Sequence, residues 1–213
     1  INIGPNKDTN NRMEDYLIGL RKFYNLADYL TINISSPNTE NLRSFHNEDE
    51  LNELLNLIEK EKKILKTTVP ITVKISPDIE DQNINIISDL LLKHNVEALI
   101  VSNTTDKNRE NLSNINKLEK GGLSGKPLEK RSNELINKFY KILKNKVKII
   151  GVGGVDSGQS AYQKIISGAS LVQLYTGMIY QGPSIASKIS EELINILDKE
   201  GVKNISDIVG SKN

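Results

Sequence analysis

Short runs of apolar and β-branched residues recur along the chain, and each is followed by a stretch with helical spacing. The runs are nearly continuous rather than alternating, which is typical of strands buried on both faces of a parallel sheet. They lie at residues 1–4, 28–35, 70–76, 97–103, 147–153 and 170–176. Amphipathic helical patterns follow them at residues 11–26, 48–65, 80–94, 128–144, 158–167 and 184–199.

Strand and helix therefore alternate six times, which predicts right-handed crossovers in a parallel α/β sheet. An open doubly wound sheet and a (β/α)8 TIM barrel both fit this alternation. Polar or glycine-rich segments follow nearly every strand, and the last two strands end in glycines and hydroxyl groups, where barrels often bind phosphate. We therefore predict a (β/α)8 barrel of which about the last six βα units are present. The two missing units would precede Ile1.

Composition and charge exclude several classes of site. The chain has 28 basic and 27 acidic side chains, so it offers no general attraction for nucleic acid or lipid. It contains no cysteine, which rules out disulfides, thiolate metal sites and a cysteine nucleophile. With two histidines, His46 and His94, we expect no metal site and no catalytic role for either. His94 should lie at the end of a helix, as a surface or C-terminal residue, and His46 in a loop after Arg43.

Two glycine-containing segments near the C-terminus predict a phosphate site. They are GVGGVDSG at 151–158 and YTG at 175–177, and they follow the last two strands. Small residues let backbone N–H groups approach an anion, and the helix end that follows adds a favourable dipole. Either segment alone could be an ordinary tight turn, but their order and spacing predict a cradle. The segment GGLSGKP at 121–127, taken alone, predicts a flexible loop.

Lys74 lies inside the apolar run ITVKIS. A lysine there is costly to bury unless an anionic group meets it. We therefore expect its side chain to point into the barrel mouth and to stabilise negative charge on a bound cofactor. The alternative is a lysine on an edge strand that reaches water.

Three asparagines, Asn2, Asn33 and Asn103, occupy similar places at the ends of predicted strands. An amide side chain offers both a donor and an acceptor. Several converging amides would suit a ligand whose edge alternates C=O and N–H groups, such as a pyrimidine or a flavin ring. Each of them could also be an ordinary turn residue.

The segment NISSPNTENLR at 33–43 resembles the dihydroorotate dehydrogenase family, specifically its quinone-linked class 2. The resemblance continues, in the family's order, in INIGPNK, VKISPD, SNTT, GGLSGKPL, IIGVGGVDSGQ and GASLVQLYTG. It covers the whole chain and implies a (β/α)8 barrel with FMN at its mouth. The implied reaction oxidises (S)-dihydroorotate to orotate in UMP biosynthesis, with a quinone of the ubiquinone type as the final electron acceptor.

The resemblance also implies roles for individual residues. Ser36 would be the base that takes a proton from C5 of dihydroorotate while hydride passes from C6 to flavin N5, with Thr39 as a candidate route for the proton. The class 1 enzymes use a cysteine here. Substrate contacts would be Asn33, Asn38, Asn103 and Thr104. FMN contacts would be Asn2, Asn33, Lys74, Ser102, Gly125, Gly154, Tyr175 and Thr176. The stretch after Arg43 would close over the substrate.

Class 2 relatives also have two N-terminal helices that dock on the membrane and guide the quinone. Neither these helices nor the first two barrel strands precede Ile1. We therefore expect residues 1–213 to be the C-terminal part of one FMN-binding barrel domain, from a peripheral protein of a bacterial inner membrane, on its cytoplasmic face, or of a mitochondrial inner membrane. Open barrel edges tend to aggregate, so we expect this fragment alone to fold poorly and to be inactive.

Two alternatives remain at this stage. A tRNA dihydrouridine synthase would have a similar barrel and FMN site, but those enzymes use a cysteine, and the lack of both a cysteine and a basic excess argues against it. The other alternative is an inert remnant of a truncated barrel. The parent open reading frame upstream of Ile1 would distinguish this case from an enzyme.

Overall fold

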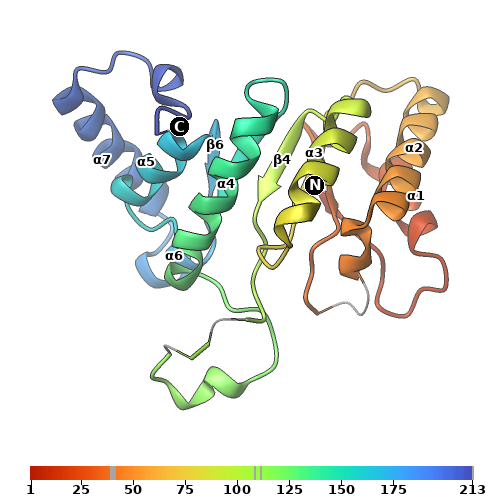
Figure 1. The fold of residues 1–213 in the computed structure, drawn as a ribbon, viewed down its shortest axis with the longest axis horizontal. Coiled ribbons are helices and arrows are strands. Elements are labelled where there is room, and N and C mark those ends of the chain that lie inside the picture. Colours follow the sequence, from red (N-terminus) through yellow and green to blue (C-terminus); the bar gives the residue numbers. More distant parts are fainter. Residues whose placement is uncertain (39–41, 108, 111, 213) are drawn as a thin grey trace.

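The strands form one parallel sheet in chain order. The computed structural model describes residues 1–38, 42–107, 109–110 and 112–212. Its strands are β1 (Asn2–Ile3), β2 (Leu30–Asn33), β3 (Ile71–Ile75), β4 (Ala98–Val101), β5 (Lys148–Val152) and β6 (Leu171–Gln173). Each pairs in parallel with the next, in the order β1-β2-β3-β4-β5-β6. All carboxyl ends therefore lie at one edge, which is the lower edge in Figure 1.

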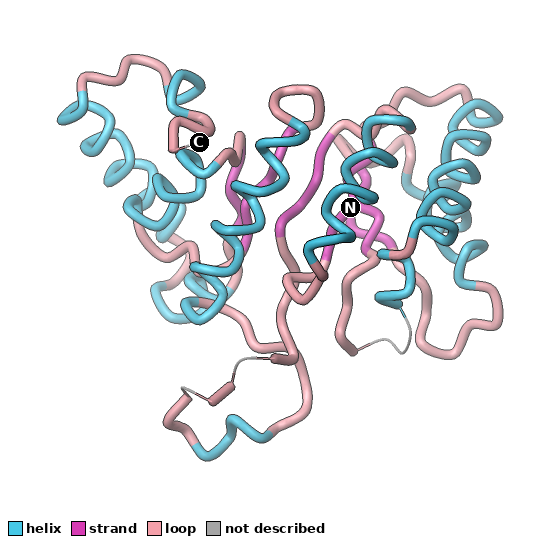
Figure 2. Tube along the Cα trace, in the orientation of Figure 1, coloured by secondary structure: helices cyan, strands magenta, loops and turns pink. Residues whose placement is uncertain are grey.

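Helices pack along the outer side of this sheet (Figure 2). They are α1 (Arg12–Phe23), α2 (Glu48–Leu65), α3 (Asp81–Lys93), α4 (Glu129–Leu143), α5 (Gly158–Ser167), the short α6 (Thr176–Gln181) and α7 (Ile185–Glu200). Four 3-10 turns are η1 (Leu42–His46), η2 (Ile115–Leu118), η3 (Lys126–Leu128) and η4 (Ile205–Ile208). Across the described residues, no helix has the length and apolar character needed to span a bilayer.

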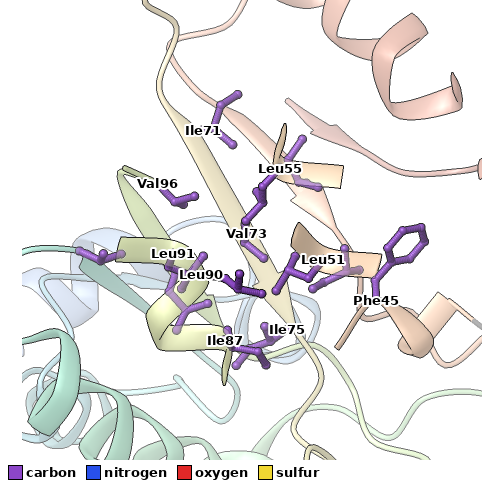
Figure 3. Packing of buried hydrophobic residues seen from close by; sticks show 14 of the residues in the cluster. Phe45, Leu51, Leu55, Ile71, Val73, Ile75, Ile87, Leu90, Leu91 and Val96 are labelled. Atoms are coloured by element: carbon purple, nitrogen blue, oxygen red, sulfur yellow. The ribbon is translucent and has the colours of Figure 1, made fainter. Parts of the chain in front are cut away.

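The main core lies between the sheet and its helices. Figure 3 shows Val73 and Ile75 of β3 among leucines of α2 and α3, including Leu51 and Leu91. These four side chains are fully buried. Alternate residues of β3, such as Lys74, face the other side of the sheet, because successive side chains of a strand point to opposite faces.

The sheet curls as in a barrel. Gln173 Nε2 of β6 donates to the hydroxyl of Tyr29, just before β2, at 3.2 Å. In a flat sheet, strands four places apart would lie roughly 19 Å from each other. The contact therefore requires strong curvature, with these two side chains on the concave face. This geometry confirms the predicted fold class, a partial (β/α)8 barrel.

All six predicted strands and all six predicted helices are present. The strands are shorter than their apolar runs; the run at 28–35, for example, contains a ladder over Leu30–Asn33. Gly168 follows the last residue of α5 with φ of +128°, which confirms the predicted helix end. The chain between β4 and α4 extends away from the carboxyl edge (Figure 1), and Thr105 and Leu123 pair at its base.

Candidate active site

Loops that follow the last three strands enclose a cavity of about 800 Å³ at the carboxyl edge of the sheet. This volume is typical of a site for a small molecule or cofactor. The lining comprises Lys74 and residues 102–104, 122–128, 152–156, 174–177 and 180–181. Of the predicted cofactor contacts, the cavity brings together Lys74, Ser102, Gly125, Gly154, Tyr175 and Thr176.

The loop after β4 touches the start of α6 directly. Thr176 Oγ1 donates to Ser124 Oγ at 2.9 Å. A Cβ added to Gly125 would lie 2.9 Å from Thr176 Cγ2, so glycine is required for this approach, and its φ of +77° favours glycine as well. The segment 121–127, which alone predicts a flexible loop, instead contacts the start of α6 through Ser124 and Gly125.

The turn after β5 also requires glycine. Gly153 and Gly154 have φ of +108° and +77°, and a Cβ on Gly154 would lie 2.5 Å from Glu129 Cβ. The start of α5 is already occupied by a carboxylate, because Gly158 N–H donates to Glu192 Oε2 at 2.6 Å. An anion in this cavity would therefore meet the backbone of the turn rather than the helix end that the sequence suggested.

Lys74 is a half-buried cation on a central strand. It is the register neighbour of Asn33 on β2 and of Ile100 on β4, which rules out an edge-strand lysine. Burial lowers the pKa of its ammonium group, and within the described chain no carboxylate pairs with it. Its head lines the cavity, so the site presents a positive charge that an anionic ligand would compensate.

A hydrogen-bond network joins the ends of β2 and β4. Asn33 Oδ1 accepts from Ser35 Oγ at 2.7 Å, and Asn103 Nδ2 donates to Ser35 Oγ at 2.9 Å. Asn103 Oδ1 in turn accepts the Thr104 N–H at 2.7 Å. The hydroxyl of Tyr16 on α1 fixes the Asn33 carbonyl at 2.7 Å. Three of the predicted substrate residues, Asn33, Asn103 and Thr104, thus converge beside the cavity.

Ser36 lies at the rim of this site rather than in the cavity lining. It is half-buried, and its Oγ accepts the Asn38 N–H at 3.2 Å. The next residue, Pro37, lies against Gly122, which lines the cavity. Pro37 and Asn38 also border a second cavity of about 810 Å³ under the loop after β4. Thr39 lies outside the described residues.

The structure does not bring Asn2 into the cavity. Asn2 is exposed on the edge strand β1 and pairs in register with Thr31. Asn33 lies two residues beyond Thr31 on β2, so Asn2 and Asn33 face the same concave side of the sheet. Asn2 lies farther than Asn33 from the carboxyl edge. Its role as a cofactor contact remains a prediction.

Arg43 connects η1 to the segments that follow two strands. Its guanidinium lies 3.1 Å from Asp78 Oδ2 and 3.0 Å from Asp106 Oδ1. Asp78 also accepts from Thr105 Oγ1 at 2.5 Å. Sequence reasoning assigns no role to the two aspartates, although the SPD and TTD segments that follow β3 and β4 place each just beyond a strand.

Both histidines are buried. His94 caps the C-terminal end of α3, as expected, but does not lie at the surface. His46 Nδ1 bonds the Arg43 carbonyl at 2.8 Å, and its Nε2 accepts the Ser76 N–H at 3.3 Å. His94 lies 3.1 Å from Glu59 Oε1 and 3.0 Å from Asn52 Oδ1. The expectation of no metal site stays a prediction, although no cluster of His, Asp or Glu in the described chain could hold an ion.

Comparisons with known proteins identify a family for this chain. The profile of the family "Dihydroorotate dehydrogenase" matches residues 1–197. A "Dihydroorotate dehydrogenase (quinone)" of Bartonella tribocorum is 42% identical over 97% of this chain and 59% of its own length. One of Nitrosomonas europaea, with the same name, is 46% identical over 88% of this chain and 57% of its own length.

A solved structure agrees with these relatives. The crystal structure of DHODH from Eimeria tenella in complex with ferulenol superposes with a TM-score of 0.95 at 38% identity, covering 99% of this chain and 61% of that one. This chain therefore spans about three fifths of the length of the proteins it matches. The matches favour neither a tRNA dihydrouridine synthase nor an inert remnant.

Proposed function

Because this chain belongs to the dihydroorotate dehydrogenase family, we propose that it oxidises (S)-dihydroorotate to orotate in UMP biosynthesis, with FMN as the hydride acceptor. The observation that carries the proposal is the side-by-side register of Asn33 and Lys74, which sets ring-binding amides next to a cation at one cavity mouth. Such an oxidoreductase needs side chains that bind the pyrimidine ring and, beside the flavin, a group that stabilises negative charge.

The residues of the cavity fit FMN. The turn at Gly154 leaves no space for a side chain and has a backbone conformation that favours glycine, so its peptide groups can come close to a phosphate. Lys74 would face the ring system, where an unpaired ammonium stabilises negative charge. Bound flavin supplies the hydride-accepting chemistry, and the protein supplies orientation and charge.

Substrate would be held by amides and hydroxyls at the ends of β2 and β4. Asn33, Asn103 and Thr104 are already joined by hydrogen bonds, which reduces the cost of ordering them around a ligand. Asn38 would complete the contacts to the carboxylate and ring amides. The amide groups match the alternating donors and acceptors of a dihydropyrimidine edge.

Ser36 would take the proton from C5 as hydride leaves C6. Serine is a poor base unless its surroundings help. The Asn38 N–H that donates to Ser36 Oγ provides such help, because a donor to the oxygen stabilises its developing negative charge. The serine proton must pass on to solvent, for which Thr39 is the proposed route.

The variant Ser36→Ala tests this role in the whole protein. We expect it to retain bound flavin and to bind dihydroorotate, but to slow flavin reduction in stopped flow by about 10²-fold or more, the usual contribution of general acid–base catalysis. Ser36→Cys, which restores an ionisable group at the same atom, is the matched control and should recover part of the rate. Normal reduction by the alanine variant would remove Ser36 from the mechanism.

Lys74→Met tests the proposed charge stabilisation. The variant keeps the length of the side chain but loses the cation, so reduced anionic flavin should form about tenfold more slowly or worse, equivalent to about 1.4 kcal/mol of barrier. The flavin reduction potential, measured spectroelectrochemically, should become more negative. Lys138→Met removes an exposed cation from α4 and should change neither quantity. An unchanged potential for Lys74→Met would contradict the assignment.

We further propose that a ubiquinone-type quinone receives the electrons, and that the enzyme is a peripheral protein of a bacterial inner membrane, on the cytoplasmic face, or of a mitochondrial inner membrane. The names of the curated relatives support the acceptor. Turnover of the whole protein with a short-chain ubiquinone, against fumarate and NAD⁺ as acceptors, tests it. Faster turnover with either of the latter would reject the proposal.

A further inference from the structure

Lys164 on α5 is a fully buried lysine that the proposed reaction does not use. Its relative exposure is 0%. Its ammonium donates to two neutral oxygens, Ser132 Oγ and Asn133 Oδ1, each at 3.0 Å, and it forms no ion pair within the described chain. Burial of a cation without an anionic partner costs free energy. We therefore expect a role of Lys164 other than packing.

Ser132 links Lys164 to the turn after β5 by hydrogen bonds. Its Oγ donates to the Val152 carbonyl at 2.6 Å, and the same carbonyl accepts the Ser102 N–H at 3.2 Å. Because an ammonium group can only donate, Lys164 leaves the Ser132 proton free for a carbonyl, and the Val152 oxygen at 2.6 Å is nearer than the Val101 oxygen at 3.2 Å. The carbonyl so anchored directly precedes Gly153 and Gly154.

The aliphatic part of the Lys164 side chain also packs against β5. A Cβ on Gly151 would lie 2.9 Å from Lys164 Cδ and 3.1 Å from Ala169 Cβ. Gly151 therefore leaves room for the stem to lie against β5, while the head reaches Ser132. The stem and the head together support the last residues of β5 and the turn that follows.

We propose that Lys164 is a positioning residue that holds the turn at 152–154 in shape for the flavin phosphate and adds positive potential behind it. The proposal rests on the proposed function of this cavity. Glu129, the acidic group whose charge acts on Lys164, is engaged by Lys126 at 2.7 Å. The charge of Lys164 therefore has only neutral ligands, and in a low-dielectric interior it acts on an anion in the turn with little screening.

Titration of Lys164 is compatible with this role. Burial lowers the pKa of its ammonium group to about 7, and the negative charge of Glu129 opposes that shift. A large fraction of the group is therefore protonated at neutral pH. A phosphate dianion bound in the turn would favour the charged form further, because an opposite charge nearby stabilises it.

Comparison of FMN with riboflavin tests the inference, since the two ligands differ by the phosphate. We expect Lys164→Met, in the whole protein freed of flavin, to weaken FMN binding about tenfold in a fluorescence titration, as for the loss of one charge-assisted contact. Riboflavin affinity should change by less than about twofold. The matched control Lys138→Met removes an exposed lysine paired with Asp81 and should leave both affinities unchanged.

A second variant covers the case in which Lys164→Met fails to fold. Ser132→Ala breaks the link and should weaken FMN selectively in the same way. If both single variants fold, the double variant should bind FMN little worse than either, because residues that act through one path are not additive. Equal losses for FMN and riboflavin, or none in Lys164→Met and Ser132→Ala, would overturn the proposal. Wild-type protein that binds neither flavin would instead refute the proposed function of the cavity.

Discussion

At the scale of single residues, Arg43 and His46 anchor η1, the segment Leu42–His46. Arg43 reaches the carboxylates after β3 and β4, and His46 bridges the Arg43 carbonyl to the Ser76 N–H. Both residues belong to η1, so the segment is attached to the sheet at two points. We infer that these contacts set the position of the proposed base.

His46 predicts a pH dependence of stability. Burial lowers the pKa of its imidazole in the folded protein to about 4, whereas an unfolded histidine titrates near 6.5. Between these values the unfolded state binds the additional proton, so stability falls as the pH falls through this window. By pH 4 the loss attributable to His46 is about 3 kcal/mol, and above pH 7 it is absent.

The control for this prediction is His46→Gln, whose amide can donate to the Arg43 carbonyl and accept from Ser76 without titrating. Urea unfolding of the whole protein at pH 4, 5.5 and 7 gives the free energy of unfolding of each form. The difference between wild type and variant isolates the histidine from the carboxylates, which titrate in both. Identical pH slopes would show that His46 does not titrate in this way.

The position of a residue can be predicted from sequence where it depends only on the strand that contains the residue. Lys74 in an apolar run, and Asn33 and Asn103 at strand ends, could be placed at the carboxyl edge because strand parity and polarity decide it. His46 could not, because its burial depends on Ser76, thirty positions away. The same holds for Lys164, whose partner Ser132 lies on another helix.

At the scale of elements, α2 offers a matched pair of isoleucines. Ile58 is 2% exposed within the main core, and Ile64 is 72% exposed on the same helix. We expect Ile58→Ala to lower the free energy of unfolding by about 2–5 kcal/mol through lost burial and a residual cavity. Ile64→Ala should change it by less than about 0.5 kcal/mol. Urea unfolding of both variants checks the pair, and similar losses would contradict the packing.

Element prediction failed for short pieces. The helix α6 has six residues, too few to show a helical repeat, and η2 lies in a polar stretch without periodicity. The conformation of segment 121–127 cannot be predicted for a related reason. Its order comes from contact with Thr176 at the start of α6, which no local pattern reveals.

At the scale of the whole molecule, the sheet has two edges, β1 and β6, without a further strand among the described residues. Unpaired strand edges recruit other chains, and Leu171 on β6 is 62% exposed. We expect these 213 residues, expressed alone, to associate with rising concentration in sedimentation velocity. Leu171→Lys should reduce association, whereas Ile115→Lys, on a loop and 85% exposed, should not. A monomer at all concentrations would refute this.

The strand order has a consequence for biosynthesis. Since each strand pairs with the one made just before it, the nascent chain can add one βα unit at a time as it leaves the ribosome. The proposed substrate-binding amides at the ends of β2 and β4 would be in place early. The glycine turn arrives one unit later and the start of α6 follows β6, so the proposed nucleotide site would be assembled only after β6 has been made. Cofactor binding would then report that these units have joined the sheet.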